Sequence, residues 1–195
     1  MLFCHQSGYA GDGPLGIDHR LSYDNSGIWS RSNQKALRNA MIVTVAAGCL
    51  WEGGETRLGK TFWQSLDASL LAGGGASAMK RVFARKRPRD ENDPDEWFQR
   101  RSYSSFPSGE VALTSAFVTP FVLEYHHEHP LVYGLELLPV YDGIARMKVH
   151  AHWQTDVLAG FALGALAGYY AHSREIPLTL VILPGRFAMG LKVYF

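Results

Sequence analysis

Three long apolar runs constrain what this chain can fold into, and each is short for a bilayer crossing. The longest uncharged run covers 157–171, and shorter runs cover 40–51 and 111–123, which contains Pro120. A membrane-spanning helix needs about 20 mostly apolar residues, whereas runs of this length are typical of buried core helices. The sequence therefore favours a soluble domain, with helices that dip into a membrane interface as the alternative.

The apolar spacing between turn signals predicts an all-α fold, a helical bundle. We expect helices over 35–51, 60–82, 108–125, 131–147 and 152–173. Proline lacks a backbone N–H and crowds the preceding turn, so we expect a kink or interruption at Pro120 and a break near Pro139. No internal repeat or linker is visible, so residues 1–195 are expected to form a single domain.

The remaining segments are polar or rich in turn residues. Residues 1–33 contain many Gly, Ser, Asp and Asn residues and predict an irregular N-terminal arm that lies on the domain. Residues 85–106 predict a long loop with one helical turn near 96–100, and loops of this length are often functional. The end of the chain, 178–195, predicts a small β-hairpin or an extended tail.

The charge balance and the cysteines exclude some classes of function. The chain has 19 basic and 18 acidic residues, for a net charge of +1, whereas a nucleic-acid-binding protein usually has a clear basic excess. The two cysteines, Cys4 and Cys49, form neither a disulfide framework nor a metal motif, although a Cys4–Cys49 pair stays open. The first residues show no signal peptide, which leaves a cytoplasmic location or a trimmed or misplaced start open.

Two segments have features of an anion site. Lys80 and Arg87 are seven residues apart, nearly two helical turns, so a helix would place both on one face. A solvated basic patch is the simpler interpretation of that segment. Ser108 is a good N-cap, and Gly109 lets a ligand approach the backbone at a helix N-terminus, where free N–H groups favour anions. A plain helix cap is the simpler interpretation there.

A third segment contains a histidine and a carboxylate four residues apart, His152 and Asp156. On a helix they would lie one turn apart on the same face. The carboxylate could then accept a hydrogen bond from one imidazole nitrogen and leave the other as a nucleophile or base. A surface pair is the alternative. A metal pair with His150 is a weaker one, because two histidines separated by one residue do not share a helix face.

Together these segments read Lys-x6-Arg-Pro, then Pro-Ser-Gly, then Arg-x5-His-x3-Asp. In this order they resemble the type 2 phosphatidic acid phosphatase superfamily, which includes class A acid phosphatases, lipid phosphate phosphatases and vanadium haloperoxidases. The similar region covers about 80–171. The resemblance implies a helical bundle with the site between helices.

The resemblance also implies roles for the matching residues. The phosphoryl oxygens would be held by Lys80, Arg87 and Arg146, which suits a reaction that mainly needs positioning and charge neutralisation. Ser108 and the Gly109 N–H would add hydrogen bonds.

The resemblance assigns the chemical step to the third motif. His152 would attack phosphorus and form a phosphohistidine, which water then hydrolyses, and Asp156 would orient His152. No metal or cofactor is implied, and phosphate or vanadate could occupy the site.

One position departs from the family pattern, since Glu110 replaces the histidine that normally follows Pro-Ser-Gly. That histidine is the expected general acid. Glu110 could serve as the acid at a lower pH optimum, or activity could be weak or lost, because nearby cations lower the pKa of a carboxyl group. His150 is a further candidate donor.

The sequence therefore predicts a phosphatase that acts on phosphate monoesters or diphosphates, either small soluble esters or lipid phosphates. The alternatives are a phosphate- or phospholipid-binding protein without turnover and, less favoured, a vanadium haloperoxidase. The expected partner is a phosphorylated small molecule or lipid phosphate and not a nucleic acid. Peripheral membrane contact and oligomeric state stay open. The resemblance implies a location in the periplasm or cell envelope.

Overall fold

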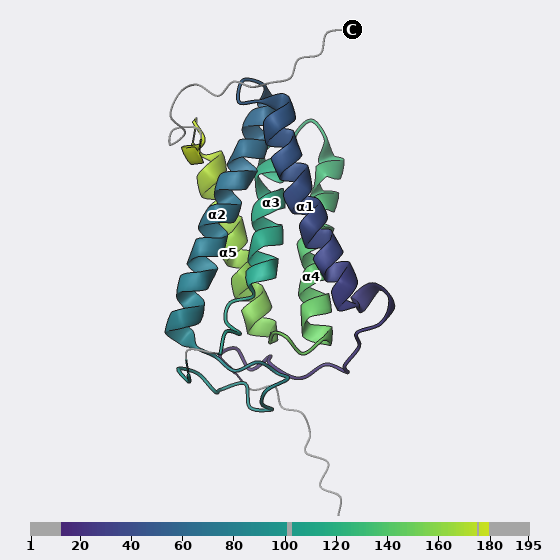
Figure 1. Cartoon of the computed structure of the whole chain (residues 1–195), viewed down its shortest axis with the longest axis vertical. Helices are drawn as coiled ribbons and strands as arrows, with labels where there is room; N and C mark the ends of the chain where they lie inside the picture. The colour runs from purple at the N-terminus through teal and green to yellow at the C-terminus, as the bar shows by residue number, and fades with distance from the viewer. Residues whose placement is uncertain (1–12, 101–102, 175, 180–195) are drawn as a thin grey trace, which may run out of the picture.

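The fold is a bundle of five α-helices, seen in a computed structural model that describes residues 13–100, 103–174 and 176–179 (Figure 1). The α-helices are α1 (Arg31–Glu52), α2 (Arg57–Phe83), α3 (Gly109–Tyr125), α4 (Leu137–Lys148) and α5 (Gln154–His172). Two 3₁₀ segments, η1 (Gly27–Trp29) and η2 (Pro130–Glu136), precede α1 and α4. The predicted all-α class is confirmed, and the described residues contain no strand. Most of the proposed hairpin, 180–195, lies outside the described residues, as does Cys4.

Three local predictions differ from the structure. The helix α3 runs through Pro120 without interruption. The break expected near Pro139 comes earlier, where η2 passes into α4. Pro139 lies in the first turn of α4, where a backbone N–H has no partner within the helix, so its missing N–H costs no hydrogen bond. The helical turn predicted at 96–100 is absent, because the backbone N–H of Phe98 instead donates to Phe83 O at the end of α2.

The helix α3 lies at the centre and contacts α1, α2, α4 and α5. Its closest neighbour is α5, because three glycines spaced four residues apart, Gly160, Gly164 and Gly168, face it. A Cβ at Gly160 would lie 2.5 Å from Ser108 O, and one at Gly164 would lie 2.4 Å from Ala112 O. Only glycine permits this approach, which brings the N-terminal ends of α3 and α5 together.

The loop after α2 and the arm that precedes α1 cross the same end of the bundle, at the bottom of Figure 1. The N-terminal ends of α3 and α5 also meet at this end, where Ser108 N donates to Asp156 O over 2.8 Å. All three sequence motifs therefore meet at this end of the bundle. Among the described residues, no helix combines the length and the apolar character that a bilayer crossing needs.

Candidate active site

A pocket of about 340 Å³ opens at this end of the bundle. It is lined by six of the eight predicted site residues: Lys80, Arg87, Gly109, Glu110, Arg146 and His152. The other two, Ser108 and Asp156, are fully buried and lie in the same sequence motifs as lining residues. Arg31 of α1, which the sequence did not single out, also lines the pocket.

Lys80 and Arg87 meet in the pocket, but not on one helix face as predicted. The helix α2 ends at Phe83, and Ala84 adopts a left-handed conformation with φ 40°, so Arg87 lies in the loop. Lys80 Nζ donates to Ser104 O at 2.7 Å and to Pro107 O at 2.6 Å. Burial and the nearby Arg87 guanidinium lower the pKa of Lys80 to about 8, so its charge is retained at neutral pH.

The start of α3 is open toward the pocket. Ser108 occupies the N-cap position, but its side chain makes no cap hydrogen bond. Its buried Oγ has no hydrogen-bond partner among the described residues, although Ser108 itself does not line the pocket. A Cβ at Gly109 would lie 3.4 Å from Lys80 Cε, so the glycine keeps the space beside the ammonium group free. This is the arrangement that favours anions at helix N-termini.

Glu110 is held in a cluster of arginines. Its carboxylate lies 2.5 Å from Arg31 Nη1, 3.0 Å from Arg38 Nη1 and 3.3 Å from Arg146 Nη1. Burial alone would raise the pKa of Glu110, but these guanidinium groups outweigh it and lower the pKa to about 2. The direction is the one expected from the sequence, although Arg31 and Arg38 of α1 supply most of the contacts. At neutral pH Glu110 therefore carries no proton to donate.

Arg146 is more buried than Arg87, the other arginine predicted to hold phosphate, with 6% of its surface exposed. Its Nη1 donates to Gln34 Oε1 at 3.2 Å, and its buried Nε has no hydrogen-bond partner among the described residues. Burial lowers the pKa of Arg146 to about 10, although Glu110 acts in the opposite direction. Arg146 thus stays charged at neutral pH and has a donor left over for a ligand.

His152 lies just before α5 and not on the helix, because Trp153 is the N-cap. Its Nδ1 is 3.7 Å from Asp156 Oδ2, close but beyond hydrogen-bond distance. Burial lowers the pKa of His152 to about 3; Asp156 opposes this shift, while Arg146 and Lys80 add to it. The imidazole is therefore neutral at physiological pH, which is the protonation state that a nucleophile needs.

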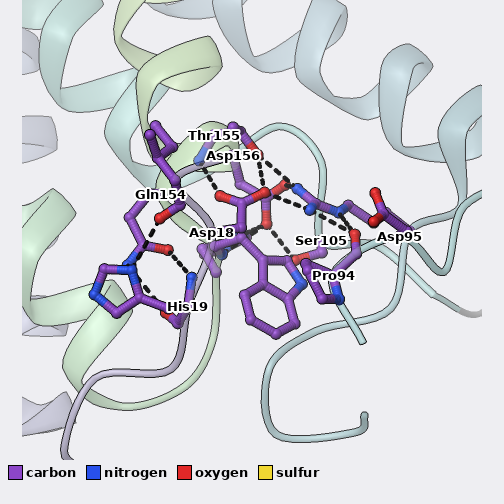
Figure 2. A network of polar contacts seen from close by, with 12 residues as sticks. Asp18, His19, Pro94, Asp95, Ser105, Gln154, Thr155 and Asp156 are labelled. Carbon is purple, nitrogen blue, oxygen red and sulfur yellow. Dashed lines mark hydrogen bonds and ion pairs between the residues drawn. The ribbon is translucent and has the colours of Figure 1, made fainter. Parts of the chain in front are cut away.

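Asp156 is fully buried and lies at the centre of the polar network in Figure 2. Its Oδ1 accepts from Arg85 at 2.7 Å, and its Oδ2 accepts from Ser105 Oγ at 2.5 Å and from Trp153 N at 2.9 Å. Burial would raise the pKa of Asp156, but His152 and Arg85 help to lower it overall. Asp156 is thus a fixed carboxylate beside the His152 ring.

The N-terminal arm completes this network through Asp18. Its carboxylate accepts from Arg85 Nη2 at 2.6 Å, from Thr155 N at 2.8 Å and from Thr155 Oγ1 at 2.6 Å (Figure 2). The Asp18 and Arg85 side chains are 0% exposed. The arm is therefore fastened to the base of the site by a buried ion pair.

Some residues of the site carry no local signal in the sequence. Asp18, Arg31 and Arg38 lie 67 to 137 positions from their partners in the pocket or network. Arg85 belongs to a basic segment, but nothing in that segment separates a buried arginine from a solvated one.

Two other expectations concern His150 and metals. His150, the candidate proton donor, does not line the pocket; its Nε2 lies 2.7 Å from Leu21 O, and its ring packs edge-on against Tyr23. Within residues 13–100, 103–174 and 176–179, no group of three or more His, Cys, Asp or Glu side chains could hold a metal ion.

Comparisons with known proteins identify the family of this chain. The model of the PAP2 superfamily, the type 2 phosphatidic acid phosphatases, matches residues 62–175. The chain belongs to the PAP2 superfamily. The PAP2 match contains the three sequence motifs, whereas Asp18, Arg31 and Arg38 precede it.

A search of curated proteins also found a similar sequence. The chain is 32% identical over 120 residues to a lipid A 1-phosphatase of Porphyromonas gingivalis, an alignment that covers 60% of this chain. The same alignment covers 24% of the relative, so the chain spans about a quarter of that protein's length. No solved structure gave a significant match.

Proposed function

We propose that this protein is a phosphatase that hydrolyses phosphate monoesters or diphosphates through a phosphohistidine at His152. The observation that carries the proposal is a neutral, buried His152 in one pocket with Lys80, Arg87 and Arg146. Phosphoryl transfer needs little covalent chemistry from the protein beyond the nucleophile, since positioning and charge neutralisation supply most of the rate. Membership of the PAP2 superfamily supports the same reaction.

The reaction would run in two steps. The Nε2 lone pair of His152 forms a bond to phosphorus while the P–O bond to the leaving group breaks, and the leaving oxygen keeps that electron pair and takes a proton. Water then attacks the phosphohistidine, the P–N bond breaks, and inorganic phosphate leaves with His152 neutral again. Asp156 faces Nδ1 and would stabilise the positive charge that the ring carries between the two steps.

The leaving group would depart without a proton from Glu110, because the carboxyl group is already ionised at neutral pH. Glu110 would instead hold Arg31 and Arg146 at the edge of the pocket. Solvent would then supply the proton, and good leaving groups such as a phenolate or the phosphate of a diphosphate would react fastest. Glu110 is also the observation that favours the second candidate, a phosphate- or phospholipid-binding protein without turnover.

The name of the similar protein, a lipid A 1-phosphatase, supports a lipid phosphate as substrate and a location in the bacterial cell envelope or periplasm. No metal is needed for the proposed steps, because the cationic side chains neutralise the phosphoryl charge. Acid phosphatase activity on small soluble esters is the competing subtype.

The test is the release of inorganic phosphate from lipid and soluble substrates measured side by side. Phosphatidic acid in mixed micelles and p-nitrophenyl phosphate are suitable probes, with His152→Gln as the inactive variant and exposed His127→Gln as its matched control. We expect release from wild type and His127→Gln and none from His152→Gln. Phosphate binding with no release from any probe at any pH would instead favour the second candidate.

A further inference from the structure

A second hollow, here called the arm-side hollow, adjoins the pocket that contains His152. Its volume is about 290 Å³, and its walls include Tyr23, Asn25, Arg31, Arg87, Arg89 and Arg146. Three of these, Arg31, Arg87 and Arg146, also line the pocket with His152. The two hollows therefore adjoin at these three residues.

The charge of the arm-side hollow differs from that of the catalytic pocket. Four arginines line it, and no carboxylate is among its described lining residues, whereas Glu110 lines the catalytic pocket. Arg87 makes hydrogen bonds to Ser104, and within the described residues it has no carboxylate within 4 Å. Burial lowers the pKa of Arg87, and the neighbouring Arg89 charge lowers it further. Arg31 and Arg146 share the Glu110 carboxylate, and Arg89 Nε lies 3.6 Å from Asp90 Oδ1. An anion in the hollow would therefore compensate the charge of Arg87 most directly.

The arm holds the walls of this hollow in place. Asp24 N donates to Lys148 O over 3.0 Å, and Asn25 Oδ1 accepts from Arg31 N over 2.7 Å. On the opposite wall, Arg89 N donates to His150 O over 3.1 Å, and the His150 ring packs against Tyr23. The backbone of Arg89 is thus fixed beside the hollow, while its side chain is largely exposed.

We infer that the arm-side hollow binds the second phosphoryl group of a diphosphate substrate, an inference that rests on the phosphatase function proposed above. The group that His152 attacks would occupy the catalytic pocket, and the group bridged to it by one oxygen would lie across the shared arginines. The planar guanidinium group donates several N–H bonds in a fixed fork that matches phosphate oxygens. Because Arg89 lines only the arm-side hollow, it would contact the second group alone.

The test compares the binding of two anions that cannot be turned over. Calorimetry at one ionic strength would give dissociation constants for inorganic phosphate and for methylenediphosphonate, whose P–C–P bridge resists hydrolysis. We expect wild type to bind the diphosphonate about tenfold more tightly or better. Arg89→Ala should weaken diphosphonate binding about tenfold, which is the effect of one charge-assisted hydrogen bond. The ratio of the phosphate to the diphosphonate dissociation constant should fall accordingly.

Two further variants sharpen the test. Arg81→Ala removes an exposed arginine that lines neither hollow and should leave the ratio at its wild-type value. Arg89→Lys keeps the charge without the fork and should restore part of the ratio. The Arg89 side chain is 57% exposed, so its replacement is not expected to unfold the bundle, which circular dichroism would check.

The inference and the proposed function fail in different ways. If wild type releases phosphate but binds the diphosphonate no more tightly than phosphate, or if Arg89→Ala leaves the ratio unchanged, the second subsite is wrong and the phosphatase stands. If wild type binds neither anion and releases no phosphate, both are wrong.

Discussion

Replacing Asp18 by alanine tests whether the N-terminal arm holds the base of the site. The Asp18 carboxylate accepts one hydrogen bond from Arg85 and two from Thr155, with distances between 2.6 and 2.8 Å. One of the two Thr155 bonds comes from a backbone N–H at the start of α5, directly before Asp156. The substitution therefore removes an ion pair and two of the arm's hydrogen bonds to α5, while those between His19 and Gln154 remain.

The expected loss follows from burial. Removing one partner of a buried ion pair costs about 3–5 kcal/mol, because the remaining charge stays buried without compensation. Arg85 would keep its hydrogen bonds to Asp156 and to Pro94 O, so we expect the free energy of unfolding to fall by about 3 kcal/mol. The free energy of unfolding of a domain is usually about 5–15 kcal/mol, so this loss would be a large part of the total stability.

Urea unfolding followed by circular dichroism measures this loss, with exposed Asp95→Ala as the control. Asp18→Asn is the informative conservative variant, because it keeps an acceptor for Thr155 N–H but removes the charge beside Arg85. We expect its free energy of unfolding to fall between those of wild type and Asp18→Ala. A loss within about 1 kcal/mol for Asp18→Ala, similar to that of an ordinary surface substitution, would refute the structural role given to the arm.

Three further predictions concern packing and pH. Gly164→Ala would place a Cβ 2.4 Å from Ala112 O, so we expect the free energy of unfolding to fall by about 1–3 kcal/mol. The control Gly74→Ala places its Cβ with nothing within 4 Å and should not destabilise the protein. Equal effects of the two variants would contradict the close packing of α3 and α5. The pKa of Lys80 is lowered to about 8, so its charge is lost as the pH rises through 8. The KM for p-nitrophenyl phosphate should therefore rise above that pH. A constant KM up to pH 10 would argue against phosphate contact by Lys80. The pKa of Glu110 is lowered from 4.5 to about 2, so its contribution to stability is full above about pH 4.5 and is lost as the pH falls toward 2. The free energy of unfolding of Glu110→Gln should therefore fall less steeply with pH over that range than that of wild type. Identical pH dependence of the two proteins would contradict the ion-pair cluster.

The sequence predicts the helical class and the residues that meet in the pocket because both depend on local patterns. Apolar spacing gives four of the five helices to within a few residues of their ends. The three motifs, with Glu110 directly after the second, supply six of the residues that line the pocket. The geometry within each motif was harder to predict. Arg87 leaves the face of α2 because Ala84 is left-handed, and no glycine marks that turn.

The residues that the sequence did not predict act across long separations. Arg31 and Arg38 reach Glu110 from α1, and Asp18 reaches Arg85 from the arm. A local pattern contains no information about such contacts, since they depend on how α1 and the arm pack on the finished bundle. The low pKa of Glu110 was expected from nearby cations, which include Arg146, but the contributions of Arg31 and Arg38 could be named only from the structure.

The proposed phosphatase mechanism requires that His152 carry the phosphoryl group during turnover. The most direct measurement is a rapid quench of the protein with p-nitrophenyl phosphate labelled at phosphorus, followed by mapping of the labelled residue. We predict a label that survives alkali and is lost in acid, as expected of phosphohistidine, at His152 in wild type and absent in His152→Ala, which should also release no phosphate. Release of phosphate by His152→Ala at the wild-type rate, or a label on another residue, would contradict the account.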